Sequence, residues 1–297
     1  MSERRVVAIT GAGRGLGRAI AEAFASDGWA VAAVGRTKTE LDDTVAAIER
    51  AAGTALACRA DVADEDHVRD AVRTVEAALG PIDALVNNAA IGGPIGPFWE
   101  SSPEDWWRAQ EVNLRGPMLC THAAVRTMVA RRRGRIVNVV SSSIPIAYFS
   151  AYITSKTAVI RFTECLAAEI KPFGVSAFTM APGTVRTRMS EDSLTSDAGR
   201  RWLPWFRRIF DEHLDMPPER PARLALALAS GRADRLSGRF FSTYHDLETM
   251  LEAAETIERD DLHTLRIRTI PSALTSPVLA GIIAEAGMAR EPSEISF

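Results

Sequence analysis

Tyr152 and Lys156 stand four positions apart in the stretch SAYITSK, a spacing that would place both side chains on one face of a helix. A phenol with a pKa near about 10 exchanges protons poorly at neutral pH. A neighbouring ammonium favours the phenolate and lowers that pKa by roughly one to three units, so the pair could act as proton donor and acceptor. Taken alone, a tyrosine and a lysine at this spacing more often lie on a packed helix surface, so the rest of the chain must decide.

A glycine-rich stretch near the start of the chain, TGAGRGLGRAIAEAF, stands between a β-branched run and a helical pattern. Its candidate binding residues are Gly11, Gly13, Arg14, Gly15, Leu16 and Gly17. Glycines let the backbone approach a pyrophosphate closely, and the following helix directs unpaired N–H groups and its positive dipole end to that anion. A flexible turn is the alternative, but a strand before the loop and a helix after it favour a dinucleotide site.

The second β-branched run ends in AVGRTK, and its charge predicts which dinucleotide binds. A ribose with a free 2′-hydroxyl is usually held by a carboxylate at this strand end, whereas a 2′-phosphate requires a cation. Here Arg36 stands at the strand end with Lys38 close by, the glycine loop adds Arg14, and no Asp or Glu competes. A guanidinium grips a phosphate bidentately, so we expect NADP(H) in preference to NAD(H). The alternative is that Arg36 only begins a solvated helix.

These residues are set in an alternation of short β-branched runs and longer helical patterns that continues to about residue 243. The expected strands are residues 4–10, 30–35, 54–60, 82–89, 134–141, 175–181 and 238–243, and the expected helices are 15–28, 38–53, 63–80, 103–133 and 150–174. This pattern predicts an α/β fold with a single doubly wound (Rossmann) parallel sheet of about seven strands and helices on both faces. We therefore expect one dinucleotide-binding and catalytic domain over residues 1–243.

Two segments break this alternation. Residues 190–218 contain RRWLPWFRRIF, and a connection of this length inside a compact domain is usually functional, most often a lid over a ligand. Residues 244–297 form a C-terminal extension, in which we expect an amphipathic helix at 245–262 and a short extended piece at 264–270. The final residues, from Pro271, could form a small apolar helix at 277–287 or dock on a partner subunit.

The motifs occur in an order that is similar to one protein family. They are Thr10 to Gly17, the DV pair at 61–62, NNAA at 87–90, Asn113, the serines at 141–143, Tyr152 with Lys156, and PGTVRT at 182–187. From Arg5 to about Thr243 the chain resembles the short-chain dehydrogenase/reductase family, in its subgroup with a T-G-x-x-x-G-x-G loop and a Y-x-x-x-K pair. One such motif would be weak evidence, whereas the ordered set is strong.

The resemblance implies further cofactor contacts. They come from Asp61 and Val62 beside the adenine, Asn88 and Ala89 along the adenine ribose, and Pro182, Gly183, Val185 and Thr187 against the nicotinamide carboxamide and phosphates. Position 90 is Ala where the family typically has Gly, and the added methyl group would narrow the nicotinamide side of the cleft slightly.

The resemblance also implies the catalytic roles. Tyr152 would donate or accept the proton while hydride moves, and Lys156 would hold the nicotinamide ribose hydroxyls. Asn113 would keep a water in line for proton relay, or bond to the backbone at a local helix distortion. A gapless match places the carbonyl-orienting hydroxyl at Ser141. Because Ser141 lies eleven positions before the tyrosine and the family usually has thirteen, Ser142 stays a candidate.

Composition limits the remaining function classes. The 297 residues carry 35 basic and 38 acidic side chains, a net charge of −3, so neither a nucleic acid nor an anionic membrane is favoured as a partner. No apolar run approaches the roughly 20 residues of a bilayer span, and the amino terminus lacks the pattern of a secretory signal, so we expect a cytoplasmic protein. Cys58, Cys120 and Cys165 have no metal-ligand spacing; we expect no metal and three inert, buried thiols.

The substrate and the assembly are less defined by the sequence. Aromatic side chains of the lid and of the loop after NNAA could enclose an apolar or aromatic carbonyl compound, or could pack the lid onto the body; they are Trp202, Trp205, Phe206, Phe210, Phe98 and Trp99. An anionic group of the substrate could meet Arg201, Arg207 or Arg208. Tyr148 could form a wall of the substrate pocket. The resemblance implies a homodimer or homotetramer through helices around residues 103–131 and 150–171. A non-catalytic NAD(P)-sensing regulator or a scaffold on the same fold is the alternative to an enzyme.

Overall fold

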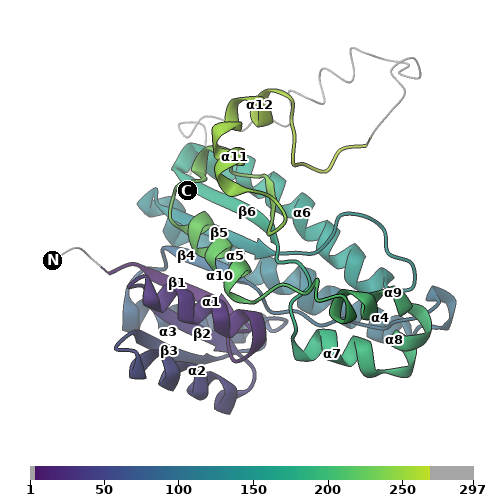
Figure 1. The fold of residues 1–297 in the computed structure, drawn as a ribbon. Coiled ribbons are helices and arrows are strands. Elements are labelled where there is room, and N and C mark those ends of the chain that lie inside the picture. Colours follow the sequence, from purple (N-terminus) through teal and green to yellow (C-terminus); the bar gives the residue numbers. More distant parts are fainter. Residues whose placement is uncertain (1–3, 268–297) are drawn as a thin grey trace.

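The computed structural model describes residues 4–267 and contains a parallel sheet of seven strands (Figure 1). The strands are β1 Val6–Thr10, β2 Ala30–Gly35, β3 Thr54–Arg59, β4 Ala84–Asn87, β5 Gly134–Val139, β6 Val175–Ala181 and β7 Phe240–Ser242. Their order is β3-β2-β1-β4-β5-β6-β7, and each pair of neighbours is parallel. The predicted fold class is confirmed.

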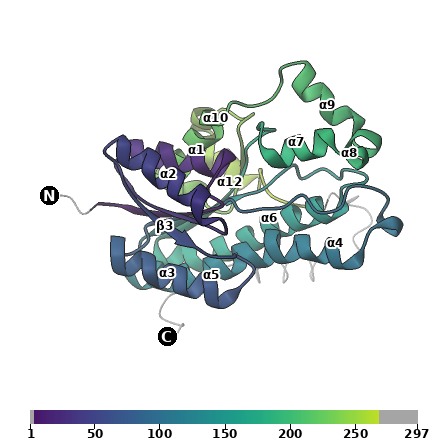
Figure 2. The same cartoon turned by 90° about the horizontal axis from the view of Figure 1, so that it is seen from below.

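Helices cover both faces of this sheet, as the strands' near-continuous apolar sequences require. One face is covered by α1 Gly15–Ser26, α2 Lys38–Arg50 and α10 Glu219–Ala229, and the other by α3 Glu65–Leu79, α5 Gly116–Arg131 and α6 Ser150–Ile170 (Figure 2). Two large apolar core clusters and one small cluster result. The first contains Phe24, Trp29 and Phe178, and the second contains Met128 and Ile136.

The direction of strand addition reverses between β1 and β4, which are hydrogen-bonded neighbours in the sheet. In an open parallel sheet, such a reversal leaves a crevice outside the carboxyl ends of the strands. The glycine loop after β1 and the Asn-Asn pair at the end of β4 both lie at this crevice. The topology therefore decides where the predicted site residues meet.

The helix expected over residues 103–133 is not continuous. The chain forms α4 Pro103–Gln110, a π-helical turn (η2) at Glu111–Arg115, and then α5. Ser102 caps α4 by accepting a hydrogen bond from the Asp105 backbone N–H. A π-helical turn inside a helix redirects its side chains, and functional sites often contain one. Asn113 stands in the middle of this turn.

Most of the segment predicted as a lid, residues 190–218, is helical rather than an irregular loop. It contains most of α7 Arg188–Thr195, together with α8 Asp197–Trp202 and α9 Pro204–Asp211. A β-bridge pairs Val185 with Met216, and the Met216 N–H donates to the Thr184 carbonyl at 2.6 Å. Both ends of the segment are therefore anchored at the same place beside the crevice.

The extension after residue 243 forms two short helices, α11 Leu247–Glu252 and α12 Ala254–Arg259, where the sequence predicts one. Met250, Ala254 and Ile257 bury their side chains in the first core cluster. The segment then reaches the sheet edge, where the Phe240 N–H donates to the His263 carbonyl at 2.8 Å. The apolar helix expected at 277–287 lies outside the described residues.

Two other expectations can be compared with the structure. Cys58 and Cys120 are buried, but Cys165 is exposed, because α6 turns this position away from the sheet; the expectation of three buried thiols is wrong there. Within residues 4–267, no helix combines the length and apolar character that crossing a membrane would require, and no group of three or more potential ligands is arranged for a metal ion.

Candidate active site

A cavity of about 710 Å³ opens at the carboxyl ends of the strands. All of the predicted site residues line it except Asn113, which has no exposed surface. Two parts of the cavity differ in character. The β2 end contains Arg14, Arg36 and Glu40, and the α6 end contains Tyr152 and Lys156.

The glycine loop between β1 and α1 has no room for side chains. A Cβ atom on Gly17 would lie 2.1 Å from the Gly11 carbonyl oxygen, and Gly11 itself has a φ of +67°. Thr10 Oγ1 accepts hydrogen bonds from the N–H groups of Asn88 and Ala89 at 3.0 and 3.1 Å, while Asn88 Nδ2 donates to the Thr10 carbonyl at 3.0 Å. These contacts fix a bare backbone loop before the α1 N-terminus, which fits a pyrophosphate.

The β2 end differs from the sequence-based expectation, because a carboxylate does reach it. Glu40 comes from the first turn of α2, and its Oε1 accepts a hydrogen bond from Arg14 Nη1 at 2.8 Å. Lys38 is not a lining residue and pairs instead with Asp42 at 2.7 Å. The expectation that no Asp or Glu competes is therefore wrong: Glu40 lies only four positions beyond Arg36, but its orientation depends on where α2 packs.

Asp61 and Val62 follow β3 and line the same end of the cavity. The Asp61 carboxylate accepts from the Ala63 N–H at 3.0 Å and from Arg108 Nη2 of α4 at 3.3 Å. Val62 is buried, and its side chain packs against Gly116, where an added Cβ atom would come within 2.8 Å of it. Contacts with α4 and α5 thus hold the loop after β3 in place.

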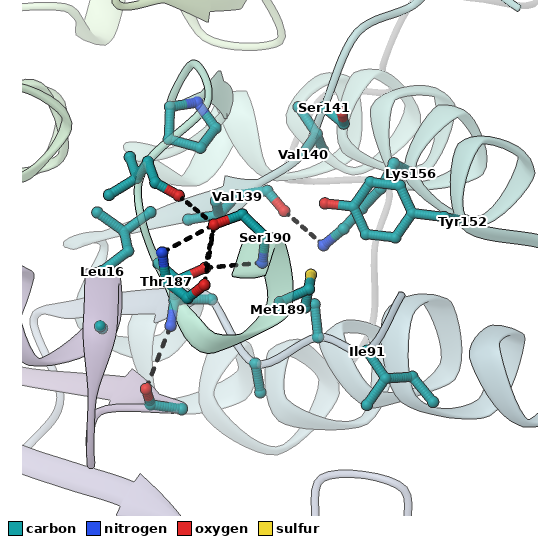
Figure 3. Close-up of a pocket in the computed structure, with 18 of the residues that line it drawn as sticks. Leu16, Ile91, Val139, Val140, Ser141, Tyr152, Lys156, Thr187, Met189 and Ser190 are labelled. Atoms are coloured by element: carbon teal, nitrogen blue, oxygen red, sulfur yellow. Dashed lines mark hydrogen bonds between the residues drawn. The ribbon is translucent and has the colours of Figure 1, made fainter. Parts of the chain in front are cut away.

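Tyr152, Ser141 and Lys156 meet at the α6 end (Figure 3). Burial raises the pKa of the Tyr152 phenol to about 12, although a hydrogen bond with Ser141 acts in the opposite direction. Burial also lowers the pKa of Lys156 to about 8. Its Nζ donates to the Val139 carbonyl at 2.9 Å and lies 5.8 Å from the centre of the tyrosine ring.

The expected lowering of the Tyr152 pKa by Lys156 is therefore wrong for this structure. Burial of the phenol outweighs the opposing hydrogen bond with Ser141, and the Lys156 ammonium is itself desolvated and directed at a carbonyl. The two groups nonetheless rise from adjacent turns of one helix face, as the four-residue spacing predicts.

Of the two candidate serines, Ser141 is the one whose hydrogen bonding opposes the rise in the Tyr152 pKa. Ser142 also lines the cavity, but its Oγ accepts from the Ile144 N–H at 3.2 Å and so closes a local turn. Phe149 was not singled out from the sequence. Its ring stacks on Tyr152 with centroids 4.9 Å apart and planes at 17°, so it covers one face of the phenol. Its position three residues before the tyrosine is the only sequence signal.

Asn113 is buried outside the cavity lining and supports the site through hydrogen bonds. Its Oδ1 accepts from the Ile91 N–H and its Nδ2 donates to the Ile91 carbonyl, both at 2.8 Å. Nδ2 also donates to Ser155 Oγ at 3.1 Å, and that hydroxyl donates to the Tyr152 carbonyl at 2.7 Å. The side chain thus connects the loop after β4 to the turn of α6 that carries Tyr152, which is the backbone-bonding alternative for this residue.

The loop after β6 brings Pro182, Gly183, Val185 and Thr187 to the cavity. Gly183 has a φ of +72°, and an added Cβ atom would come within 3.1 Å of Thr243. Thr187 is the N-cap of α7 and lies beside the glycine loop, 3.2 Å from where a Cβ atom on Gly15 would stand. The first turn of α7 therefore faces the first turn of α1 across the crevice.

The wall above the α6 end is apolar. Leu203, Trp205 and Phe206 of the 190–218 segment line it, together with Met189 and Ile146. None of the lid arginines does: Arg208 pairs with Glu212, and Arg201 stacks on Trp202 at 4.7 Å.

Tyr148 is not a lining residue either, and its ring packs against Trp202 at 4.6 Å. The proposed anionic contact through the lid arginines and the substrate wall at Tyr148 are therefore wrong.

Seven parallel strands in this order, with a glycine loop after the first, define the class of Rossmann-fold dinucleotide-binding proteins. Within that class the chain belongs to the short-chain dehydrogenase/reductase family, since its residues 5–198 match the family model described as short chain dehydrogenase. It is therefore an oxidoreductase of this family.

Related sequences and structures agree with this assignment. A short chain dehydrogenase of Pseudocercospora fijiensis is 34% identical over 87% of this chain and 88% of its own length, and the short chain dehydrogenase andI of Emericella variicolor is 37% identical over 88% and 89%. The crystal structure of levodione reductase matches with a TM-score of 0.75 at 28% identity over 80% of this chain and 95% of that one. An actinorhodin polyketide ketoreductase with NADPH matches with a TM-score of 0.74 at 25% identity over 82% and 96%.

Proposed function

We propose that this protein is an NADP(H)-dependent oxidoreductase that interconverts a carbonyl compound and a secondary alcohol, with Tyr152 as general acid and base. The observation that supports this best is the shared cavity. A phosphate-type glycine loop and the side chains of Ser141, Tyr152 and Lys156 line the same 710 Å³ space. A non-catalytic sensor has no physical need for a buried phenol beside a buried lysine.

The residues along the crevice fit a nicotinamide dinucleotide. Gly11 to Gly17 would hold its pyrophosphate, Arg36 its 2′-phosphate, Asp61 and Val62 its adenine side, and Asn88 with Ala89 the ribose beside it. Pro182 to Thr187 would hold the nicotinamide half. When bound, the cofactor supplies or accepts the hydride.

The residues at the α6 end would supply or accept the proton of the substrate oxygen. With a pKa raised to about 12, the Tyr152 phenol is protonated at neutral pH and is ready to donate to a carbonyl oxygen during reduction. Ser141 would hold that oxygen in line, and the Lys156 ammonium would stabilise the phenolate that forms. In the oxidation direction the phenolate would be the base, which requires a higher pH.

The substrate is expected to be a carbonyl compound with an apolar or aromatic body. Leu203, Trp205, Phe206, Met189 and Ile146 offer it an apolar wall. Two structural neighbours are named for ketone reduction, levodione reductase and the polyketide ketoreductase, which supports this class of reaction.

Two further parts of the proposal concern organisation. We infer a homodimer or homotetramer through α4, α5 and α6, and residues 244–297 as a C-terminal extension of a domain over 1–243. Size-exclusion chromatography of the full chain and of a chain ending at residue 243 tests both, although loss of Met250 and Ile257 from the core is expected to weaken the shorter chain. The cytoplasmic location stays a prediction.

NADPH oxidation against a panel of neutral aliphatic, cyclic and aromatic ketones tests the activity. The wild type is expected to turn over at least one of these ketones, and Tyr152→Phe to bind NADPH without turnover. Turnover that survives this substitution would remove Tyr152 from the mechanism. Cofactor binding by the wild type with no turnover of any ketone or alcohol would favour the sensor.

A further inference from the structure

The β2 end of the cavity contains both chemical groups that distinguish the two nicotinamide dinucleotides. Arg36 lines it, and no carboxylate pairs with that side chain anywhere in residues 4–267. Glu40 lines it as well, and its carboxylate is bonded to Arg14. A carboxylate suits a ribose 2′-hydroxyl, whereas a guanidinium suits a 2′-phosphate.

The position of Glu40 is built into the fold rather than left to a mobile side chain. Its Cβ atom lies 2.9 Å from where a Cβ atom on Gly13 would stand, and its Oε2 lies 3.5 Å from the same point. The absence of a side chain at Gly13 therefore makes room for Glu40 directly over the phosphate loop. Thr44 of the same helix donates to the Ala12 carbonyl at 3.0 Å, which holds α2 against the loop.

Ion pairs at the β2 end reduce the positive charge that a 2′-phosphate would meet. Arg14 and Glu40 compensate each other, and Lys38 is compensated by Asp42 outside the cavity lining. Within residues 4–267, Arg36 is then the only one of these three cations without a carboxylate partner. A phosphate bound in this part of the cavity would also meet the negative charge of Glu40.

We infer that Glu40 is a specificity-determining residue that limits the preference for NADP(H) and lets the same site accept NAD(H). It withholds the Arg14 guanidinium from a 2′-phosphate, and it offers an acceptor to a 2′-hydroxyl. Arg36 alone then sets the remaining preference for the phosphorylated cofactor. This inference rests on the proposed cofactor site and adds the residue that regulates its selectivity.

The test measures dissociation constants of NADP⁺ and NAD⁺ for the full chain by isothermal titration calorimetry, without any substrate. Glu40→Gln keeps the shape of the side chain and removes its charge. The ratio of the NAD⁺ constant to the NADP⁺ constant is expected to rise about tenfold, the effect of one charged contact. Most of the rise should come from tighter NADP⁺ binding, with a smaller loss of NAD⁺ affinity.

Asp42→Asn is the matched control, because it removes the same charge one half-turn further along α2 from a residue that pairs with Lys38 and does not line the cavity. Its ratio is expected to stay within about twofold of the wild type. An unchanged ratio in Glu40→Gln, or an equal change in both variants, overturns the inference while leaving NADP(H) use intact. Failure of the wild type to bind either dinucleotide overturns the proposed function itself.

Discussion

The charged side chains at the two ends of the cavity differ in their exposure to water. At the β2 end, the Arg14 and Glu40 side chains are 53% and 34% exposed and form an ion pair that water and salt screen. At the α6 end, Lys156 is only 2% exposed, and burial alone lowers its pKa to about 8. The first end can therefore select a ligand by charge, while the second can shift the proton affinity of its own groups.

This difference shows that residue type and spacing do not by themselves set reactivity. Tyr152 and Lys156 have the spacing of an activated pair, yet burial raises the phenol's pKa instead of lowering it. The side chains at the β2 end stay exposed to water, so the ion-pair partner of each cation, rather than burial, decides what that cation can bind. Variants at the two ends should consequently differ in the size of their effects and in their response to pH and salt.

The largest effect is expected from Tyr152→Phe, which keeps the ring and its stacking on Phe149 but removes the hydroxyl. kcat for ketone reduction should fall about a thousandfold, because general acid catalysis contributes roughly 10²–10⁴-fold. The dissociation constant of NADPH, followed by fluorescence, should change little. A fall of less than tenfold would show that another group supplies the proton.

A smaller effect is expected from Ser141→Ala, about a hundredfold in kcat, since one orienting hydrogen bond at a reacting oxygen is lost. Ser142→Ala is the matched control, because its hydroxyl accepts from the Ile144 N–H at the adjacent position. It should retain at least about a third of the wild-type rate if it serves the turn alone. Reversal of the two results would assign the catalytic serine to Ser142.

The pH dependence of kcat/KM for reduction should report the protonation of Lys156 at the buried α6 end. Below pH 8 both Lys156 and Tyr152 carry their protons in the free protein, and above it Lys156 loses its charge while the phenol, with a pKa of about 12, does not. kcat/KM for reduction should therefore be constant below about pH 8 and fall by up to about tenfold over the next pH unit.

Lys156→Arg is the control for this profile. Arginine stays charged throughout this range, so the fall above pH 8 should disappear, at a lower plateau because the side chain is larger. A wild-type profile that is flat to pH 10 would contradict the assigned role of Lys156.

The smallest effect is expected at the exposed end and should depend on salt. Arg36→Ala should weaken NADP⁺ binding about tenfold at low ionic strength and only about threefold in 0.5 M salt, because salt screens exposed charges. NAD⁺ binding, measured in parallel, should change less than twofold. Equal losses for both dinucleotides would mean that Arg36 supports the loop rather than the 2′-phosphate.

Much of the fold could be predicted because its signals are local. The alternation of β-branched runs with helical periodicity identified all seven strands to within a few residues, since strand and helix periods are properties of short windows. The glycine loop was recognisable for the same reason. A local helix distortion at Asn113 was one of the alternatives that the sequence offered, but its extent over Glu111–Arg115 was not predicted, because the contact of Asn113 with Ile91, 22 residues away in the chain, accompanies it.

The sequence by itself determined the doubly wound sheet, the phosphate loop and the neighbouring placement of Tyr152 and Lys156, because each depends on residues close together in the chain. Only the tertiary structure decided that Glu40 reaches Arg14, that the lid arginines do not line the cavity, and in which direction the pKa values of Tyr152 and Lys156 move. These outcomes depend on burial and on contacts between distant segments, and both arise only when the helices pack onto the sheet.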